Sequence, residues 1–282
     1  MLTKMSRIPQ KIEEFNLYIE SFLGSIKDKR KYSKVETFFL FIGNPRSGHT
    51  LVSSILDAHP NIICDSTEQN IISLVKKGFT QEQIFYILQK RANQFAKLNK
   101  LKTGYSYEIT NSYQGNFELV KAIGVDFIAF PLAIQENPIL LNSICNKIFN
   151  CNIKFIHIIR NPFDAISTMT KKNKLNLSLD DRINFYSKNC EAVYNLQNRL
   201  NQKLFLTIKH EDFVFNPNLL IQKMGCFLNI EFSKDQIVSY SSIVNSKPNK
   251  TRNNITWSNQ QIKAVNQIIE KYYFLEGYNY ND

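Results

Sequence analysis

The stretch FFLFIGNPRSGHT combines two glycines, a basic residue and a hydroxyl at a spacing suited to binding phosphate. Gly43 and Gly48 are separated by four residues, and Thr50 follows two positions later. This is the G-x-x-x-x-G-x-[ST] spacing of a P-loop, which binds phosphate through backbone N–H groups and a helix N-terminus. The usual P-loop lysine is replaced by His49, while Arg46 supplies a cation inside the loop.

The missing lysine narrows the choice of ligand. In nucleoside-triphosphate enzymes that lysine contacts the β- and γ-phosphates, and the hydroxyl residue holds Mg²⁺. His49 is shorter than lysine and largely uncharged at neutral pH. We therefore expect a single 5′-phosphate-like anion held by Arg46, Ser47, Gly48, His49 and Thr50, with no metal ion.

A second candidate phosphate site lies in the stretch KFIHIIRNPFDAISTM. It places Arg160 at the end of an apolar strand and Ser167 and Thr168 two turns into the next helix. Ligands of open α/β sheets bind beyond the carboxyl ends of the strands, where Arg46 and Arg160 would both lie. An arginine with a hydroxyl suits a separate phosphate. Two phosphate subsites without the P-loop lysine and its Mg²⁺ together indicate a ligand that carries two separate phosphates.

These motifs resemble those of the sulfotransferases that use 3′-phosphoadenosine 5′-phosphosulfate (PAPS). Pro45–Thr50 is similar to their 5′-phosphosulfate loop, and the D-A-H-P tail at Asp57–Pro60 resembles the tyrosylprotein sulfotransferases and their bacterial and protist relatives. The 3′-phosphate motif places its arginine on Arg160 and its serine on Thr168. A later segment places the adenine-stacking residue of the family on His210.

The resemblance implies metal-independent, in-line transfer of a sulfuryl group to a hydroxyl or amine of a small-molecule acceptor, releasing adenosine 3′,5′-bisphosphate (PAP). Negative charge then grows on the bridging oxygen of the leaving 5′-phosphate. Fixed hydrogen-bond donors aimed at such charge are usually the largest source of acceleration. Arg46 fits this role.

The residue that removes the proton of the acceptor is left open by the sequence. In the tyrosylprotein branch a catalytic glutamate follows D-A-H-P, but its position is Thr67 here, and Glu68 comes one residue later. Glu68 is either that base or a first-turn helix carboxylate. His49 is either a phosphate ligand or the base, and Asp65 and Asp126 are outside candidates.

Basic side chains elsewhere are further candidates. Relatives close a basic loop over the 3′-phosphate, and the polar segment 245–254 offers Lys247, Lys250 and Arg252, unless it is simply a solvated loop. Lys121 is either a second cation for the sulfuryl group or an ordinary strand lysine.

Strand and helix patterns alternate along the chain, which predicts an α/β fold with a central parallel β-sheet flanked by helices. The resemblance implies that this is the P-loop-NTPase-like sulfotransferase fold. We expect one domain over 1–282, with a helical lead-in at 1–36 and a motif-bearing core at 38–278. Two capping boxes, Ser66–Gln69 and Thr80–Gln83, predict helix starts. The other predicted elements are a helix at 10–30, strands at 38–42, 61–64, 154–159 and 203–209, a loop with at most one strand at 101–117, a helix at 179–201 and three helical patterns after it.

Composition limits the remaining functions. The 282 residues carry a net charge of +11, which favours an anionic ligand, but no block of five like charges indicates nucleic acid. Five cysteines without a C-x-x-C pair favour reduced thiols. No stretch approaches 18 apolar residues and the N-terminus lacks a signal segment, so we predict a cytoplasmic protein without membrane contact. A homodimer is compatible with these features.

Two other functions compete with sulfuryl transfer. A P-loop kinase or NTPase-like phosphotransferase would need Mg²⁺ and an acidic residue ending a strand, and His49 at the lysine position argues against it. A catalytically degenerate member of the fold would bind the nucleotide without turnover, which the displaced Glu68 leaves open.

Overall fold

The computed structural model describes residues 7–102, 104–145, 149–171 and 176–282. A five-stranded sheet lies at its centre, with every neighbouring pair parallel and the order β2-β5-β1-β6-β7. The predicted α/β class with a central parallel sheet is confirmed. The strands are β1 (Thr37–Gly43), β2 (Ile62–Asp65), β5 (Ala122–Asp126), β6 (Asn152–Ile159) and β7 (Phe205–Lys209).

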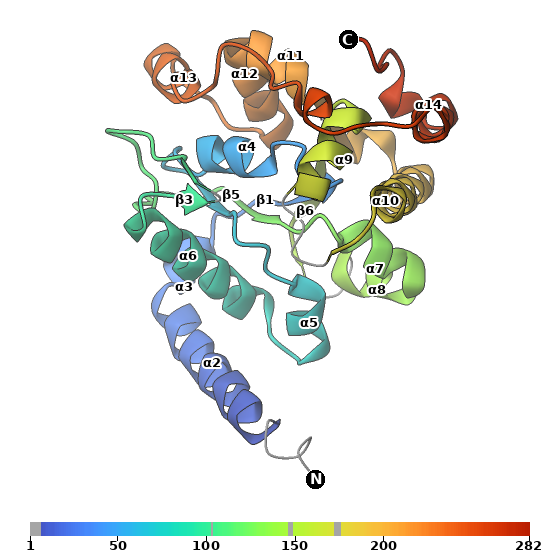
Figure 1. The fold of residues 1–282 in the computed structure, drawn as a ribbon. Helices are drawn as coiled ribbons and strands as arrows, with labels where there is room; N and C mark the ends of the chain where they lie inside the picture. The colour runs from blue at the N-terminus through green and yellow to red at the C-terminus, as the bar shows by residue number, and fades with distance from the viewer. Residues whose placement is uncertain (1–6, 103, 146–148, 172–175) are drawn as a thin grey trace.

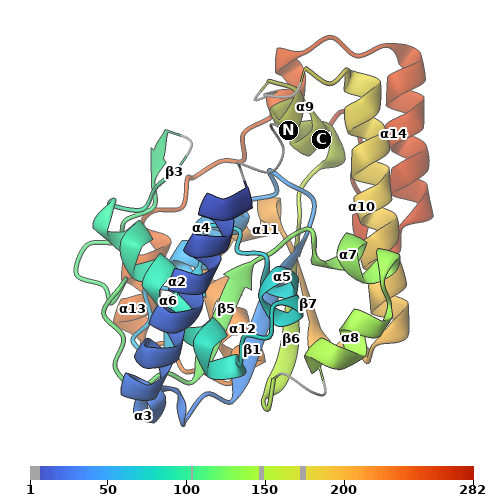
Figure 2. The same cartoon turned by 90° about the horizontal axis from the view of Figure 1, so that it is seen from below.

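Helices cover both faces of the sheet, as Figures 1 and 2 show. This explains why β1 is apolar throughout and buried at all seven positions. One face carries α4 (His49–Leu56), α11 (His210–Phe215), α12 (Pro217–Leu228) and α13 (Lys234–Ser241). The other face carries α5 (Ile71–Lys76), α6 (Gln81–Lys97), α7 (Phe130–Glu136), α8 (Ile139–Ser143) and α10 (Leu179–Arg199). α9 (Pro162–Lys171) and α14 (Asn259–Lys271) pack against α10.

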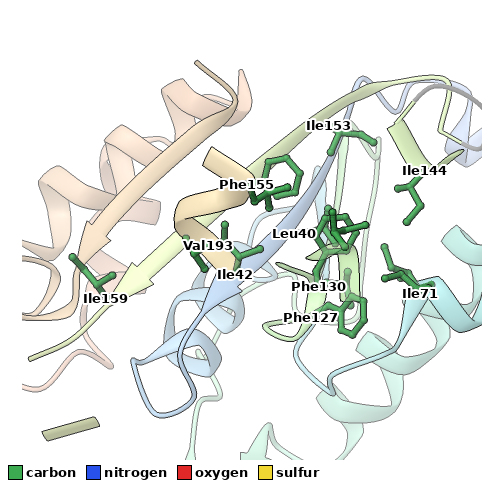
Figure 3. Packing of buried hydrophobic residues seen from close by; sticks show 14 of the residues in the cluster. Leu40, Ile42, Ile71, Phe127, Phe130, Ile144, Ile153, Phe155, Ile159 and Val193 are labelled. Carbon is green, nitrogen blue, oxygen red and sulfur yellow. The ribbon is translucent and has the colours of Figure 1, made fainter. Parts of the chain in front are cut away.

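Alternate residues of β1 enter two separate cores. Leu40 and Ile42 belong to the core beneath α6, α7 and α10, whereas Phe39 and Phe41 pack on the α4 and α12 side. Figure 3 shows the first of these cores, in which strand residues meet side chains from several helices; its labelled members are Leu40, Ile42, Ile71, Phe127, Phe130, Ile144, Ile153, Phe155, Ile159 and Val193. The central strand is therefore fixed from both sides, and the loop that follows it starts from a rigid base.

The register brings the functional segments to one edge of the sheet. Gly43 lies opposite Ile158 of β6, and Phe41 lies opposite Asp126, the last residue of β5. Because all strands are parallel, the loop after β1, Arg160 after β6 and the acidic ends of β2 and β5 lie at the same carboxyl edge. This is where ligands bind in open α/β sheets.

The predicted lead-in forms α2 (Arg7–Lys27) and α3 (Lys29–Tyr32), and residues 1–6 lie outside the described part of the chain. α2 lies against the outer side of α6, which separates it from the sheet (Figures 1 and 2). Among the described residues, no helix has the length and apolarity needed to cross a bilayer.

The prediction of a capping box at Ser66–Gln69 was wrong. The helix begins at Asn70, whose side chain accepts a 3.0 Å hydrogen bond from the backbone N–H of Ser73. The Ser66 hydroxyl pairs instead with the Ser53 hydroxyl at 2.7 Å, since Ser66 is buried against α4. The Thr80 box is confirmed at the start of α6.

Two other regions contain more structure than the sequence indicated. The segment predicted as a loop at 101–117 opens with a two-stranded hairpin, β3 (Leu101–Lys102) and β4 (Tyr105–Ser106). After β7 the described chain has four α-helices instead of three, because Pro217 begins α12 directly after the short α11.

Candidate nucleotide-binding and active site

The loop between β1 and α4 has a backbone that requires glycine at two positions. Gly43 has φ +126° and Gly48 has φ +102°, and Gly48 is the N-cap of α4. A Cβ at Gly48 would lie 2.6 Å from Nδ1 of His210, and one at Gly43 would lie 2.9 Å from Cδ2 of His157. The loop therefore packs tightly on its support, with the first amides of α4 free to bind an anion.

Arg46 is held in an unusual backbone conformation. Its φ of +67° lies in the left-handed region, which a side chain with a Cβ rarely adopts. Strained residues of this kind concentrate at functional sites, where the surrounding structure enforces them. Burial raises the pKa of Tyr107, and the charge of Arg46 opposes this shift.

Arg160 joins the two predicted phosphate motifs. Its Nη1 donates a 3.2 Å hydrogen bond to the backbone carbonyl of Arg46, and its Nη2 donates to the carbonyl of Asn249 in the segment 245–254. The guanidinium is mostly buried, and its Nε–H has no partner among the described residues. An unpaired buried donor costs about 1–3 kcal/mol, which a bound anion would offset.

Several other buried polar atoms near these motifs also lack partners. They are Oγ of Ser47, Oγ of Ser167 and Nδ1 of His210. Burial, followed by the charges of Arg160 and His49, lowers the pKa of His210 to about 4, so its ring is neutral at pH 7. Hydroxyls and an arginine N–H left unpaired around a glycine loop are the equipment of a phosphate site.

Thr168 and the segment 245–254 are connected directly. The Thr168 hydroxyl lies 2.9 Å from the Thr251 hydroxyl and donates to the Asp164 carbonyl at 2.8 Å. Lys250 is exposed beside this contact. The segment 245–254 therefore already lies over α9 and Arg160.

Arg252 faces the protein interior. Its Nη2 lies 2.7 Å and its Nε 3.1 Å from the two carboxylate oxygens of Asp164, and both side chains are buried. Its Nη1 donates to the carbonyls of Asn279 and Tyr280 at 3.0 and 3.2 Å. In this arrangement Arg252 fastens the segment 245–254 to α9 and to the C-terminal residues, and its hydrogen-bonding groups are occupied by protein.

A group of charged side chains lies next to the loop at the ends of β2 and β5. The carboxylate of Glu68 is exposed and pairs at 3.0 Å with Nζ of Lys102, which also donates to the Ser66 carbonyl at 2.7 Å. The Asp65 carboxylate forms an ion pair with Nε of Arg91 at 3.0 Å and accepts a hydrogen bond from the backbone N–H of Thr67. Glu68 is thus the carboxylate of this group that an acceptor can reach.

Asp126 is buried, as Asp65 is, but its Oδ1 has no partner among the described residues. Burial raises its pKa to about 7, with Lys102 opposing this shift and the carboxylates of Glu68 and Asp65 adding to it.

His49 lies beneath the loop. Its Nε2 donates a hydrogen bond of 3.3 Å to the Ile42 carbonyl, and its ring packs edge-on against Phe41. Burial lowers its pKa to about 4, so His49 is neutral at pH 7 and only weakly basic. In this position His49 is suited to support the loop from below and is poorly suited to accept a proton.

Comparisons with known proteins decide the family. A model of the sulfotransferase domain matches residues 36–274, which is most of the chain. The chain belongs to the sulfotransferase family. Protein-tyrosine sulfotransferase A of Caenorhabditis elegans is 25% identical over 244 residues, covering 77% of this chain and 62% of that protein. Protein-tyrosine sulfotransferase 2 of Gallus gallus is 24% identical over 245 residues, covering 84% and 62%. The chain thus spans less than two thirds of either relative.

Solved sulfotransferase structures share the fold. The sulfotransferase domain of the Synechococcus PCC 7002 olefin synthase superposes with a TM-score of 0.54 at 16% identity, covering 84% of this chain and 94% of that one. Sulfotransferase STF9 from Mycobacterium avium gives 0.55 at 12% identity, covering 93% and 81%. The predicted family and fold are confirmed.

The sulfotransferase fold brings most of the predicted residues together. The loop, Arg160, Ser167 and Thr168 meet at one edge of the sheet, and His210 packs against Gly48. Lys121 does not join them, because it precedes β5 at the opposite edge.

The second cation near the loop is Lys102, which sequence reasoning missed. Lys102 lies in an irregular, weakly patterned segment, and only the hairpin places its ammonium beside Glu68. No local pattern in the sequence could have indicated this position.

Proposed function

We propose that this sulfotransferase moves a sulfuryl group from PAPS to a hydroxyl or amine of a small-molecule acceptor and releases PAP. The observation that supports this most strongly is the direct contact between the two phosphate motifs. Arg160 reaches the Arg46 carbonyl while its own Nε–H remains unpaired and buried. Two anion subsites that adjoin in this way suit a nucleotide with phosphates at both the 5′ and 3′ positions.

The residues present fit such a nucleotide. The amides and hydroxyls of Ser47–Thr50 at the start of α4 would hold the 5′-phosphate. Arg160, with Ser167 and Thr168, would hold the 3′-phosphate, and the unpaired buried atoms of Arg160 and Ser167 would gain partners. The neutral ring of His210, which lies beside Gly48, would contact the adenine.

Bound PAPS would supply both the sulfuryl group and a 5′-phosphate leaving group. Arg46 would stabilise negative charge on the bridging oxygen from within the loop. This role requires no lysine at position 49, which is consistent with His49 serving as a support beneath the loop.

We assign proton removal from the acceptor to Glu68. A general base must lie within hydrogen-bond reach of the proton that it takes, and Glu68 is the exposed carboxylate at this edge. Lys102 orients it through the 3.0 Å ion pair. Asp126 has a pKa near neutrality but is buried, so we assign it an electrostatic role in the same group.

The hairpin of β3 and β4 would line the acceptor side, since its Lys102 lies 3.0 Å from the Glu68 carboxylate. Two relatives are named protein-tyrosine sulfotransferases, which makes a phenolic hydroxyl the first acceptor class to assay. Cytoplasmic location remains a prediction.

Calorimetric titration tests the donor assignment. We expect PAP to bind without metal and ATP with Mg²⁺ to bind much more weakly. Arg160→Ala should weaken PAP binding roughly 10- to 150-fold, the range for loss of a charge-assisted hydrogen bond. Arg199→Ala removes an exposed arginine at the end of α10 and should leave PAP binding unchanged.

Each rival function predicts a different result. Tight Mg²⁺-dependent ATP binding without PAP binding would indicate a phosphotransferase. PAP binding without transfer of radiolabelled sulfate to any phenol, alcohol or amine in a screen would indicate a degenerate member of the fold. No PAP binding by the folded protein would overturn the proposal.

A further inference from the structure

The N-terminal helix α2 carries its large apolar side chains on the outside of the molecule. Phe15 is 65% exposed and Leu23 is 62% exposed. The spacing of three and four residues puts all members on one face of the helix. We call this face the α2 stripe; its residues are Ile12, Phe15, Ile19, Phe22, Leu23 and Ile26.

The opposite face of α2 packs on the body, mainly on α6, through small and polar residues together with Leu17 and Tyr18, whose ring lies 5.1 Å from that of Phe79. Ser21 and Ser25 are buried there. Gly24 packs so closely that an added Cβ would lie 2.1 Å from the ring of Tyr86. The side chain of Gln83 donates hydrogen bonds of 3.2 Å to the Ser21 hydroxyl and to the Tyr18 carbonyl. The helix is therefore inverted relative to an ordinary surface helix, which buries its apolar face.

Ion pairs fix this orientation. Glu14 pairs with Lys77 of the segment after α5 at 2.8 Å, and Glu20 pairs with Lys90 of α6. Rotating α2 to bury the stripe would break both pairs and would place large side chains where Gly24 now fits. None of the described residues covers the stripe, and a contiguous exposed apolar face of this kind commonly marks an interaction site.

Charge around the stripe identifies the partner. The exposed residues at its ends and just beyond α2 are predominantly basic: Lys11, Lys27, Lys29, Arg30 and Lys34. Of the three acidic side chains of α2, Glu14 and Glu20 are paired with lysines of the body, and Glu13 is exposed. A helix with aromatic and aliphatic residues on one face and flanking lysines is suited to the surface of an anionic bilayer.

A second copy of the chain is the less suitable partner. Lys11 lies near one end of the stripe and the cluster from Lys27 to Lys34 lies at the other. Parallel or antiparallel pairing of two α2 helices would therefore place basic residues of one copy against those of the other.

We propose that the α2 stripe binds the surface of a bilayer containing anionic lipids, with α2 lying in the plane of the interface. This is peripheral attachment and does not require a spanning helix. It replaces the sequence-based expectation that the protein has no membrane contact. It is independent of the reaction proposed for the carboxyl edge of the sheet.

Vesicle flotation tests the proposal. We expect the full chain to bind vesicles of phosphatidylcholine mixed with phosphatidylglycerol, and to bind pure phosphatidylcholine at least 10-fold more weakly. Phe15→Ser combined with Leu23→Ser should reduce binding to the anionic vesicles at least 10-fold. A matched control is Phe215→Ser with Leu219→Ser, because those side chains are 62% and 61% exposed on another part of the surface and should not affect binding.

A second measurement separates insertion from simple charge attraction. The Phe15→Trp variant should show a blue-shifted fluorescence spectrum with anionic vesicles, whereas Trp257 is buried and should respond little. Unchanged flotation of the Phe15→Ser/Leu23→Ser variant would overturn the proposal. A stripe-dependent dimer in solution that does not bind vesicles would also overturn it, in favour of a second copy.

Discussion

The guanidinium of Arg160 donates a 3.2 Å hydrogen bond to the backbone carbonyl of Arg46, across 114 residues of sequence. The carbonyl belongs to the residue whose left-handed backbone shapes the phosphate loop. Arg160 also donates to the Asn249 carbonyl, so one side chain connects both phosphate motifs with the segment 245–254. Binding of a phosphate at one subsite should therefore change the phosphate affinity of the other subsite.

Arg46→Ala should lower the rate of sulfate transfer by roughly 10²–10³, the usual effect of removing one oxyanion donor. PAP affinity should fall far less, because the main interaction of Arg46 is with charge that develops in the transition state. Turnover with radiolabelled PAPS and a phenol acceptor, together with calorimetry of PAP, measures both quantities. Equal losses in rate and in PAP affinity would show that Arg46 serves ground-state binding instead.

Glu68→Gln should lower the transfer rate by roughly 10²–10⁴, the range for loss of a general base. PAP affinity should be retained, because Glu68 pairs with Lys102 and does not contact the loop directly. Glu118→Gln changes another exposed carboxylate, ahead of β5, and should leave the rate unchanged. Full activity of the Glu68→Gln enzyme would move the base assignment elsewhere in the charged group.

Gly48→Ala should abolish PAP binding and lower the free energy of unfolding by roughly 1–3 kcal/mol. The alanine would have to adopt φ +102° and would place its Cβ 2.6 Å from Nδ1 of His210. Gly78→Ala is the matched control, because Gly78 has φ +81° with no atom within 4 Å of the added Cβ. Urea denaturation should show the smaller loss for Gly78→Ala, with PAP binding intact; retained PAP binding by Gly48→Ala would contradict the packed loop.

Arg252→Ala should lower the free energy of unfolding by roughly 3–5 kcal/mol, because it leaves Asp164 buried without its partner. Lys271→Ala breaks the exposed 3.9 Å pair with Glu191 and should cost less than about 1 kcal/mol. Denaturant titration compares the two. If Arg252→Ala kept full stability and lost only PAP binding, Arg252 would be a phosphate ligand as the sequence suggested.

Asp126 should make stability depend on pH. Burial raises its pKa from 3.8 in the unfolded chain to about 7 in the folded protein, so the folded state favours the protonated carboxyl. The stabilisation from the protonated carboxyl is fully present below about pH 4 and is lost progressively as the pH rises to about 7. Above that pH, Asp126 causes no further change in stability. The total loss is about 4 kcal/mol.

Asp126→Asn provides the comparison, since the amide does not titrate. Wild-type stability relative to this variant should fall between pH 4 and pH 7 in urea titrations. A difference that stays flat across this range would show that Asp126 is ionised throughout, and that a partner or solvent reaches its carboxylate.

Local patterns were enough to predict the elements that carry the loop. A run of apolar residues predicts a strand buried on both faces, as found for β1, and Thr80 with Gln83 predicts the capping box of α6. Gly43 and Gly48 mark the loop because each needs a positive φ. These predictions succeeded because they depend on backbone conformation and on neighbours close in sequence.

The tertiary structure decided which side chains meet. Arg252, a predicted ligand, binds the Asp164 carboxylate, while Lys102 reaches Glu68 through a hairpin without a recognisable pattern.

The sequence alone therefore determined the strand–loop–helix unit and the family resemblance, and it predicted an anionic ligand. The fold alone decided the partners of the charged residues and the outward direction of the α2 stripe, fixed by Glu14, Glu20 and the close approach of Gly24 to Tyr86. The physical reason is that backbone preferences act locally, whereas ion pairs and packing depend on distances between residues far apart in the chain.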